Sequence, residues 1–220
     1  MVNFLLFIQK ISHYSKYDID SGKTPLEIYK LCSCIRETFC LSYAIRKNNI
    51  LYLYFQEEFI LIKFEGSKLR YLGPNERSLA LLLLKALNKA KNSQSNYRDQ
   101  WEKSTPGIYV RTFFDIFSFM EFLTSILKGT NFLIVDYQQV VKEKGENFTL
   151  NKNLKIIKED DFFIIPTYII SKQDSKIIKK FKELKSIKLI SLSKINGVEN
   201  KILYINFLKD QQAILRITLR

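Results

Sequence analysis

Short apolar runs alternate with segments of helical periodicity in the second half of the chain, and this alternation constrains the fold more than any other feature. The runs at 132–136, 161–165 and 189–190 have the length and composition of buried strands. Apolar residues at helical spacing occupy about 113–127 and 174–184, before the first run and between the last two. Strands that alternate with helices favour an α/β fold with a parallel sheet flanked by helices.

The first half of the chain predicts three more strands and a helix. The strands are expected at 2–9, 50–55 and 59–64, where apolar residues dominate. The last two are separated by Gln56-Glu57-Glu58, which suits a tight hairpin. A helix is expected over 26–45. Its inner side would be formed by four apolar residues, Leu31, Ile35, Phe39 and Leu41.

Turn-forming and polar segments set the remaining boundaries. Pro74-Asn75-Glu76 is typical of a helix start, because Asn75 can cap the helix and Glu76 suits the positive end of its dipole. A polar linker is expected at 91–105, followed by a short strand at 107–110. Three segments complete the prediction: a charged loop at 142–153, a helix capped by Asp174, and 198–208, which fits either a helix or a strand.

The composition favours a globular domain with a polyanionic partner. The chain has 220 residues, of which 46% are apolar, so it can bury a sizeable core and is predicted to form one domain over 1–220. Its net charge of +13 predicts binding to RNA or DNA ahead of a membrane surface. The alternative is that the lysine-rich composition reflects a genome bias, with surface lysines that bind no partner.

The cysteines and the N-terminus favour a cytoplasmic location. Cys32, Cys34 and Cys40 are odd in number and close in sequence, which indicates buried thiols in a reducing compartment. Val2–Ile8 is too short for a signal peptide, and no long uncharged apolar run occurs, so we expect no membrane span. His13 is the only histidine, and we expect no metal site.

Charged and turn-forming residues gather at the ends of apolar elements. They form the blocks Arg46-Lys47-Asn48, Phe64-Glu65-Gly66 and Gly73-Pro74-Asn75-Glu76-Arg77. Folds of the α/β class bind ligands outside strand and helix ends, so these blocks predict a site, with helix capping as the structural alternative. The lysines between 172 and 188 form a further basic segment, which is either a phosphate-binding face or a solvated helix face.

Several blocks together resemble a known family. They are 41–48, 60–66, 73–78 and Gly107-Ile108-Tyr109-Val110, in this order and with compatible spacing. The chain resembles the archaeal tRNA (pseudouridine-54-N1)-methyltransferases, which belong to the SPOUT superfamily of S-adenosylmethionine-dependent RNA methyltransferases. The resemblance runs over most of residues 2–136.

The resemblance implies a SPOUT-like α/β domain with a C-terminal trefoil knot, the cofactor and knot region lying at about 130–210. It also implies a homodimer, a tRNA substrate and S-adenosylmethionine as cofactor, which reacts by direct methyl transfer to a ring nitrogen. Arg46 would hold the RNA near the reacting base, and Glu76 and Arg77 would shape the site at the adjacent helix start. Five residues would contact the cofactor through their backbone: Ile165, Pro166, Ser191, Leu192 and Ser193.

The cofactor loops depart from the family pattern. The family has Gly-Asp-His where this chain has Pro166-Thr167-Tyr168, and Ser-Leu-Gly-Pro where it has Ser191-Leu192-Ser193-Lys194. Glycine allows close approach of a ligand to the backbone, whereas proline removes an N–H donor. A second hypothesis is therefore a catalytically degenerate SPOUT-fold RNA-binding or dimeric interaction protein that has lost cofactor binding. A third is a basic globular protein unrelated to RNA.

Overall fold

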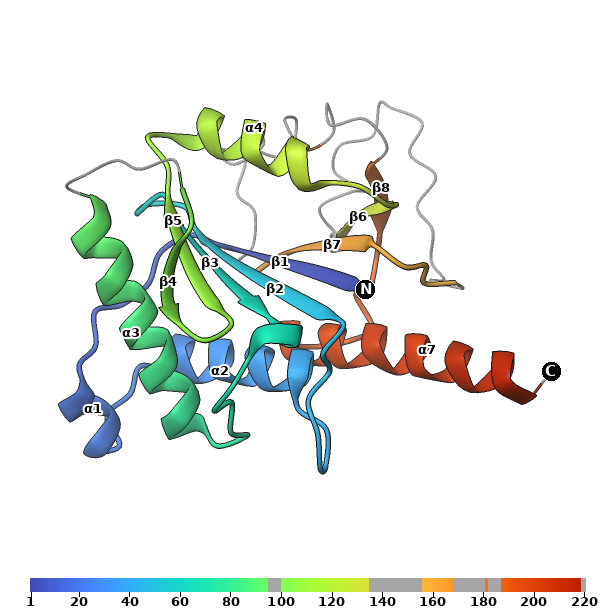
Figure 1. The fold of residues 1–220 in the computed structure, drawn as a ribbon, viewed down its shortest axis with the longest axis horizontal. Coiled ribbons are helices and arrows are strands. Elements are labelled where there is room, and N and C mark those ends of the chain that lie inside the picture. The colour runs from blue at the N-terminus through green and yellow to red at the C-terminus, as the bar shows by residue number, and fades with distance from the viewer. Residues whose placement is uncertain (95–99, 135–155, 168–180, 182–186, 219–220) are drawn as a thin grey trace.

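The computed structural model describes residues 1–94, 100–134, 156–167, 181 and 187–218. Helices and strands are interspersed along the described part of the chain, and a 3-10 turn, η1, follows the third strand (Figure 1). The elements are β1 Val2–Ile8, α1 Lys16–Asp20, α2 Leu26–Phe39, β2 Asn49–Phe55, β3 Ile60–Glu65, η1 Gly66–Lys68, α3 Glu76–Gln94, β4 Glu102–Thr105, β5 Ile108–Thr112, α4 Ile116–Ile126, β6 Asn131–Ile134, β7 Asp161–Pro166, β8 Ile187–Ile190 and α7 Val198–Thr218.

The strands form an eight-stranded sheet in the order β4-β5-β3-β2-β1-β7-β6-β8. From β2 to β8 the neighbours are parallel, whereas β2, β3, β5 and β4 pair antiparallel. The prediction of a parallel sheet is therefore correct for one half and wrong for the other, because the sheet is mixed. The physical reason is loop length: the short turns that join β2 to β3 and β4 to β5 can only connect antiparallel neighbours.

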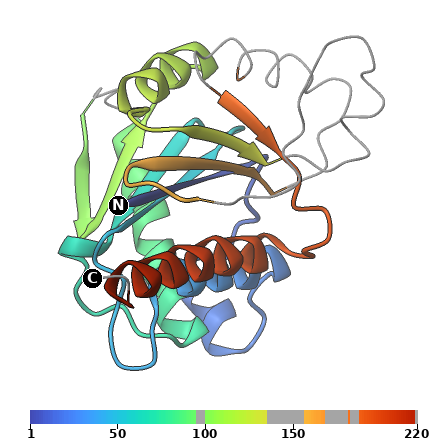
Figure 2. The same ribbon diagram turned by 90° about the vertical axis from the view of Figure 1, so that its right-hand side faces the viewer.

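Helices cover both faces of the sheet (Figures 1 and 2). On one face lie α1, α2, α3 and α7, and on the other lies α4. The central strand β1 is buried along its whole length, as expected of a strand with both faces covered. Phe4 and Leu6 belong to the core under α2 and α3, whereas Leu5 and Phe7 belong to the core under α4.

The C-terminus of α2 is held by donors from the residue that follows it, from residues 46–49 and from α7. The last four carbonyl groups of a helix have no partner within the helix. In α2, each of these four carbonyl groups accepts a hydrogen bond. The bonds are Cys40 N to Arg36 O at 2.7 Å, Asn206 Nδ2 to Glu37 O at 2.8 Å, Asn49 Nδ2 to Thr38 O at 2.9 Å, and Arg46 N to Phe39 O at 2.7 Å.

This helix is shorter than the sequence predicts. It ends at Phe39 rather than at residue 45, and Leu41 is 44% exposed instead of lying on the inner side. The chain turns back after the helix, where Cys40 and Ile45 form an isolated antiparallel bridge. Leu31, Ile35 and Phe39 are buried, as predicted.

The structure corrects the prediction for one segment and resolves the ambiguous prediction for another. The polar linker predicted at 91–105 instead contains the end of α3 and, at Glu102–Thr105, the edge strand β4. The ambiguous segment 198–208 lies in the helix α7, which packs on α2. The charged loop at 142–153, the helix start at Asp174 and the segments on which a knot would depend lie outside the described residues.

None of the helices in the described part of the chain has the length and apolar character that crossing a membrane requires.

Candidate functional site

The predicted cofactor residues meet at the carboxyl edge of the parallel strands. Ile165 and Pro166 end β7, and Ser191, Leu192 and Ser193 follow β8. The strand β6 pairs in parallel with both, so their carboxyl ends share one edge of the sheet. Two inter-strand steps separate them, about 10 Å. The structure thus brings these five residues to one place.

The side chains at this edge divide into a buried and an accessible set. Ile165 is 1% exposed and Leu192 is 6% exposed, so both belong to the core. The Ser191 hydroxyl donates to the Ser193 hydroxyl at 3.2 Å, in an exposed position. Hydroxyl groups both donate and accept hydrogen bonds, which suits the ribose hydroxyls of a nucleoside cofactor. These two residues could therefore bond to the polar groups of S-adenosylmethionine.

Two backbone groups at the same edge already have partners within the chain. Thr167 N donates to Phe7 O at 3.0 Å, which continues the pairing of β7 with β1. Leu192 O accepts from Ile195 N at 2.9 Å, which closes a turn after β8. The single N–H of Thr167 is therefore committed to the fold, whereas Leu192 O keeps a second lone pair with which it can accept from a ligand.

Arg46 lies at the opposite edge of the sheet. It precedes Asn49, which starts β2 opposite Val2, and Val2 in turn pairs with Asp161 at the start of β7. Pro166 is five residues further along β7, so at least about 16 Å of strand separates the two positions.

The guanidinium of Arg46 is bound to α7. Its Nη1 donates to Asp210 Oδ1 at 2.8 Å and lies 2.7 Å from Oδ2, and the side chain is only 17% exposed. Its Nε is buried and has no hydrogen-bond partner in the described part of the chain. Sequence reasoning missed Asp210, since nothing local in the sequence connects it to an arginine 164 positions away.

Glu76 and Arg77 form the first turn of α3, as predicted. Asn75 caps this helix, its Oδ1 accepting from Ser78 N at 2.8 Å. Arg77 donates to Asp20 Oδ1 through Nε at 3.0 Å and through Nη2 at 2.7 Å, which ties α3 to α1. Neither residue lies at the carboxyl edge of β7 and β8. Within one chain, the predicted catalytic residues therefore lie apart from the predicted cofactor residues.

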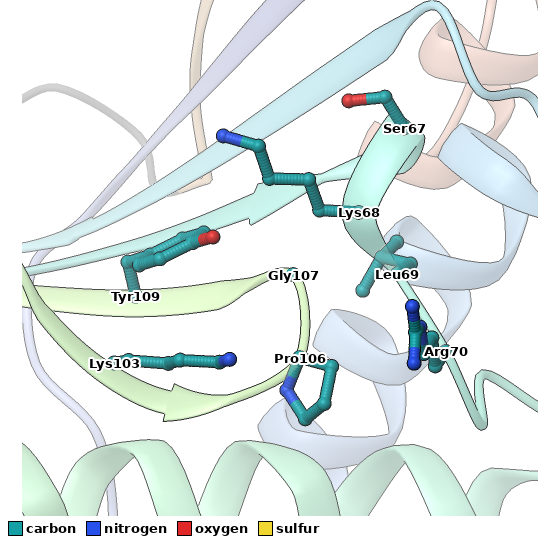
Figure 3. Close-up of a pocket in the computed structure, with 8 residues that line it drawn as sticks. All are labelled: Ser67, Lys68, Leu69, Arg70, Lys103, Pro106, Gly107 and Tyr109. Atoms are coloured by element: carbon teal, nitrogen blue, oxygen red, sulfur yellow. The ribbon is translucent and has the colours of Figure 1, made fainter.

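A basic hollow that sequence reasoning missed lies between η1 and the β4–β5 turn (Figure 3). Its volume is about 370 Å³. Its lining contains three cations, one tyrosine and no carboxylate: Ser67, Lys68, Leu69, Arg70, Lys103, Pro106, Gly107 and Tyr109. The cations come from two stretches of chain about 35 residues apart, and the lining gathers only when β5 pairs with β3.

Glu65 borders this hollow and neutralises part of its charge. Its carboxylate lies 3.2 Å from Lys63 Nζ and 2.8 Å from Lys68 Nζ. Burial pushes the pKa of Glu65 upward, but the hydrogen bonds and charges of the two lysines outweigh it, and the pKa falls below its usual value. Glu65 is therefore a paired anion.

The cysteines are free thiols, and two of them are buried as predicted. Burial raises the pKa of Cys32 to about 12 and also raises the pKa of Cys34. His13 is exposed. Within the described ranges, no three histidine, cysteine or acidic side chains come together in a way that could hold a metal ion.

Comparisons with known proteins place these features in a family. A protein-family model described as "Putative SAM-dependent RNA methyltransferase" matches residues 12–195. A tRNA (pseudouridine(54)-N(1))-methyltransferase of Methanocaldococcus jannaschii is 33% identical over 193 residues, covering 85% of each chain. The enzyme of the same name from Methanococcus aeolicus is 30% identical over 176 residues, covering 75% of this chain and 74% of its own.

Among solved structures, Archaeoglobus fulgidus Nep1 bound to S-adenosylhomocysteine aligns with 93% of this chain and 92% of its own, at 14% identity and a TM-score of 0.45. The family-model match extends from before α1 to the loop after β8, so it spans both sets of predicted site residues. The chain therefore belongs to the family of SAM-dependent RNA methyltransferases that includes the archaeal tRNA (pseudouridine(54)-N(1))-methyltransferases.

Proposed function

We propose that this chain methylates N1 of pseudouridine 54 in tRNA with S-adenosylmethionine as the methyl donor. The observation that carries the proposal is the 33% identity to the M. jannaschii enzyme over 85% of both chains. The net charge of +13 supports a polyanionic substrate, because lysine and arginine neutralise RNA phosphates.

The carboxyl edge of β7 and β8 is the part of the chain that would hold the cofactor, which supplies an activated methyl group when bound. Ile165 and Leu192 keep their side chains in the core and so fix the backbone on which the ligand would rest. The Ser191 and Ser193 hydroxyls would bind its polar groups. The chain contributes by positioning, because methyl transfer requires the two reactants to be held close and aligned.

A homodimer is the arrangement that would complete the site. Arg46 lies at the amino edge of the strands and cannot reach a ligand at the carboxyl edge of the same chain. The helix α7 presents an apolar stripe to solvent beside the Arg46–Asp210 pair, formed by Leu203, Phe207 and Ile214 at 44, 53 and 61% exposure. Burying this stripe against a second copy would place Arg46 of one protomer at the interface.

The alternative function is a tRNA-binding relative that no longer transfers a methyl group. It is favoured by the backbone N–H of Thr167 at the carboxyl edge, which is already bonded within the chain. Loss of cofactor binding would leave the basic surface and the proposed dimer intact.

Calorimetry with S-adenosylmethionine separates the two functions. Saturable binding at micromolar cofactor, together with methyl transfer to unmodified tRNA, is expected for the enzyme. Tight tRNA binding without any heat of cofactor binding at millimolar concentration would overturn the enzyme assignment and support the alternative.

Complementation tests the shared site. Arg46→Ala and Ser193→Trp should each inactivate a homodimer, the first at the RNA side and the second at the cofactor side. Mixing the two in equal amounts with subunit exchange should restore about a quarter of wild-type activity, since half of the dimers are mixed and each carries one intact site. No restored activity, although exchange is demonstrated, would contradict a site built across two protomers.

A further inference from the structure

A row of basic and aromatic side chains crosses the open part of the sheet at β3, β5 and β4. Lys63 pairs in register with Tyr109, and Tyr109 pairs with Lys103. Directly opposed residues of antiparallel strands point to the same face, so these three side chains lie together. They lie on the face that carries α4, because Tyr52, opposite Lys63, belongs to the core under α4.

The ring of Tyr109 organises two of the cations. Lys63 Nζ lies 4.7 Å and Lys68 Nζ 5.8 Å from the ring centroid. Lys63 Nζ also lies 4.9 Å from the ring of Trp101. Cation–π contacts at these distances fix the lysine side chains and reduce the ordering cost of binding an anion.

The remaining cations of the hollow have no anion of their own. Glu65 pairs with Lys63 and Lys68, but Arg70 and Lys103 are exposed and have no ion-pair partner in the described part of the chain. Figure 3 shows the Tyr109 hydroxyl and the Lys103 ammonium pointing the same way, toward the β4–β5 turn and Arg70. Free donors therefore converge on one space of about 370 Å³.

The backbone around the hollow is held in place by close packing. Gly107 has a φ of +82°, and a Cβ there would lie 2.5 Å from Leu69 N. Glu65 N donates to Gly107 O at 2.8 Å, which joins the end of β3 to the β4–β5 turn. The two sides of the hollow are thus fixed relative to each other before any ligand arrives.

We propose that this hollow binds a phosphate of the RNA backbone, as a docking site separate from the methyl-transfer site, with Arg70 and Lys103 as its principal donors. The identification of the anion as RNA rests on the proposed function. Within one chain, four inter-strand steps, about 19 Å, separate β5 from β7, so the hollow is distinct from the carboxyl edge of β7 and β8.

The test is the salt dependence of tRNA binding by the full-length chain and the double variant R70A/K103A. Each lost phosphate contact lowers the slope of log K against log salt by up to about 0.9, so the double variant should lose up to about 1.8 and bind at least tenfold more weakly at low salt. Binding of S-adenosylmethionine and the thermal midpoint should not change. R70K/K103R keeps both charges and should retain most of the affinity.

A matched control is Lys128→Ala, which removes an exposed lysine beyond α4, next to β6 and away from the hollow. It should leave tRNA affinity close to that of the wild type. If R70A/K103A keeps the wild-type affinity and slope, the hollow does not contact RNA and the proposal fails. Saturable binding of inorganic phosphate with unchanged tRNA affinity would also overturn it, in favour of a small-anion site.

The outcomes separate this proposal from the proposed function. A wild-type chain that methylates tRNA, with a double variant that binds RNA normally, refutes the docking site alone. A wild-type chain that binds tRNA through the hollow without methylating it refutes the enzyme assignment and leaves the docking site standing. Activity at saturating tRNA gives a second readout, because loss of a docking contact should raise KM and leave kcat unchanged.

Discussion

Asn206 is the residue whose replacement tests the fold most directly. It is 1% exposed in the middle of α7, where an apolar residue would ordinarily face α2. Its Nδ2 donates to Glu37 O at 2.8 Å, and its Oδ1 accepts from Asn49 Nδ2 at 3.0 Å. The variant Asn206→Ala removes both bonds at once and leaves a carbonyl in the last turn of α2 without its donor.

The expected destabilisation follows from these two bonds. Leaving a buried polar group unsatisfied costs about 1–3 kcal/mol. Asn49 keeps its second bond, to Thr38 O at 2.9 Å, so it loses only part of its hydrogen bonding. We expect the free energy of unfolding to fall by about 2–4 kcal/mol. For a chain of this size that corresponds to a fall in Tm of roughly 4–16 °C.

Urea denaturation followed by circular dichroism measures the change, at one fixed protein concentration for all variants. Asn200→Ala is the matched control, since Asn200 is exposed on the same helix and its Nδ2 donates to the nearby Asn196 O at 2.8 Å. A surface change of this kind should stay within about 0.5 kcal/mol of the wild type. If Asn206→Ala is no more destabilising than the control, the network does not hold α7 on α2 and the reasoning is refuted.

Three further predictions concern the interface, the turns and the thiols. Phe207→Glu should convert a dimer to a monomer in sedimentation without loss of secondary structure, and an unchanged dimer would exclude this face of α7 as the interface. Gly107→Ala should lower the free energy of unfolding by more than about 3 kcal/mol, because a positive φ is combined with a Cβ position 2.5 Å from Leu69 N. Gly22→Ala, with a φ of +71° and open space around the Cβ position, should lower it by only about 1 kcal/mol in chemical denaturation. In the folded chain at pH 8, a thiol reagent should label half-buried Cys40 first, whereas burial raises the pKa of Cys34 and should protect it until unfolding; equal labelling rates would contradict this.

The sequence predicts the elements whose local signals agree with their burial. The strands β1, β2 and β3 are continuous apolar runs, and the start of α3 follows from its Asn75 cap. The segment of β4 reads Glu-Lys-Ser-Thr. An edge strand needs no apolar pattern, so the sequence predicts a linker there rather than a strand. The segment of α7 stayed ambiguous because its amphipathic pattern is interrupted by Asn206, a polar residue that is buried only once α2 is present.

The candidate site was predictable only in part, for the same physical reason. The sequence alone can indicate that residues at the ends of parallel strands lie near one another, and the five predicted cofactor residues do lie at one edge of the sheet. The opposite positions of Arg46 and Pro166 depend on the order of the strands, which local patterns do not contain. The hollow beside Tyr109 forms only because β5 pairs with β3, and no motif in either strand predicts this pairing.

The central position of β1 sets the timing of folding during synthesis. Its partner β2 follows within about 50 residues, but its other partner, β7, begins only at Asp161. At 5–20 residues per second, about 5–20 s of translation separate the completion of β2 from that of β7. Throughout this interval a seven-residue apolar strand has an unpaired edge that can recruit a strand from another nascent chain. Chaperone dependence in vivo, rather than low equilibrium stability, is therefore the expected weakness of this topology.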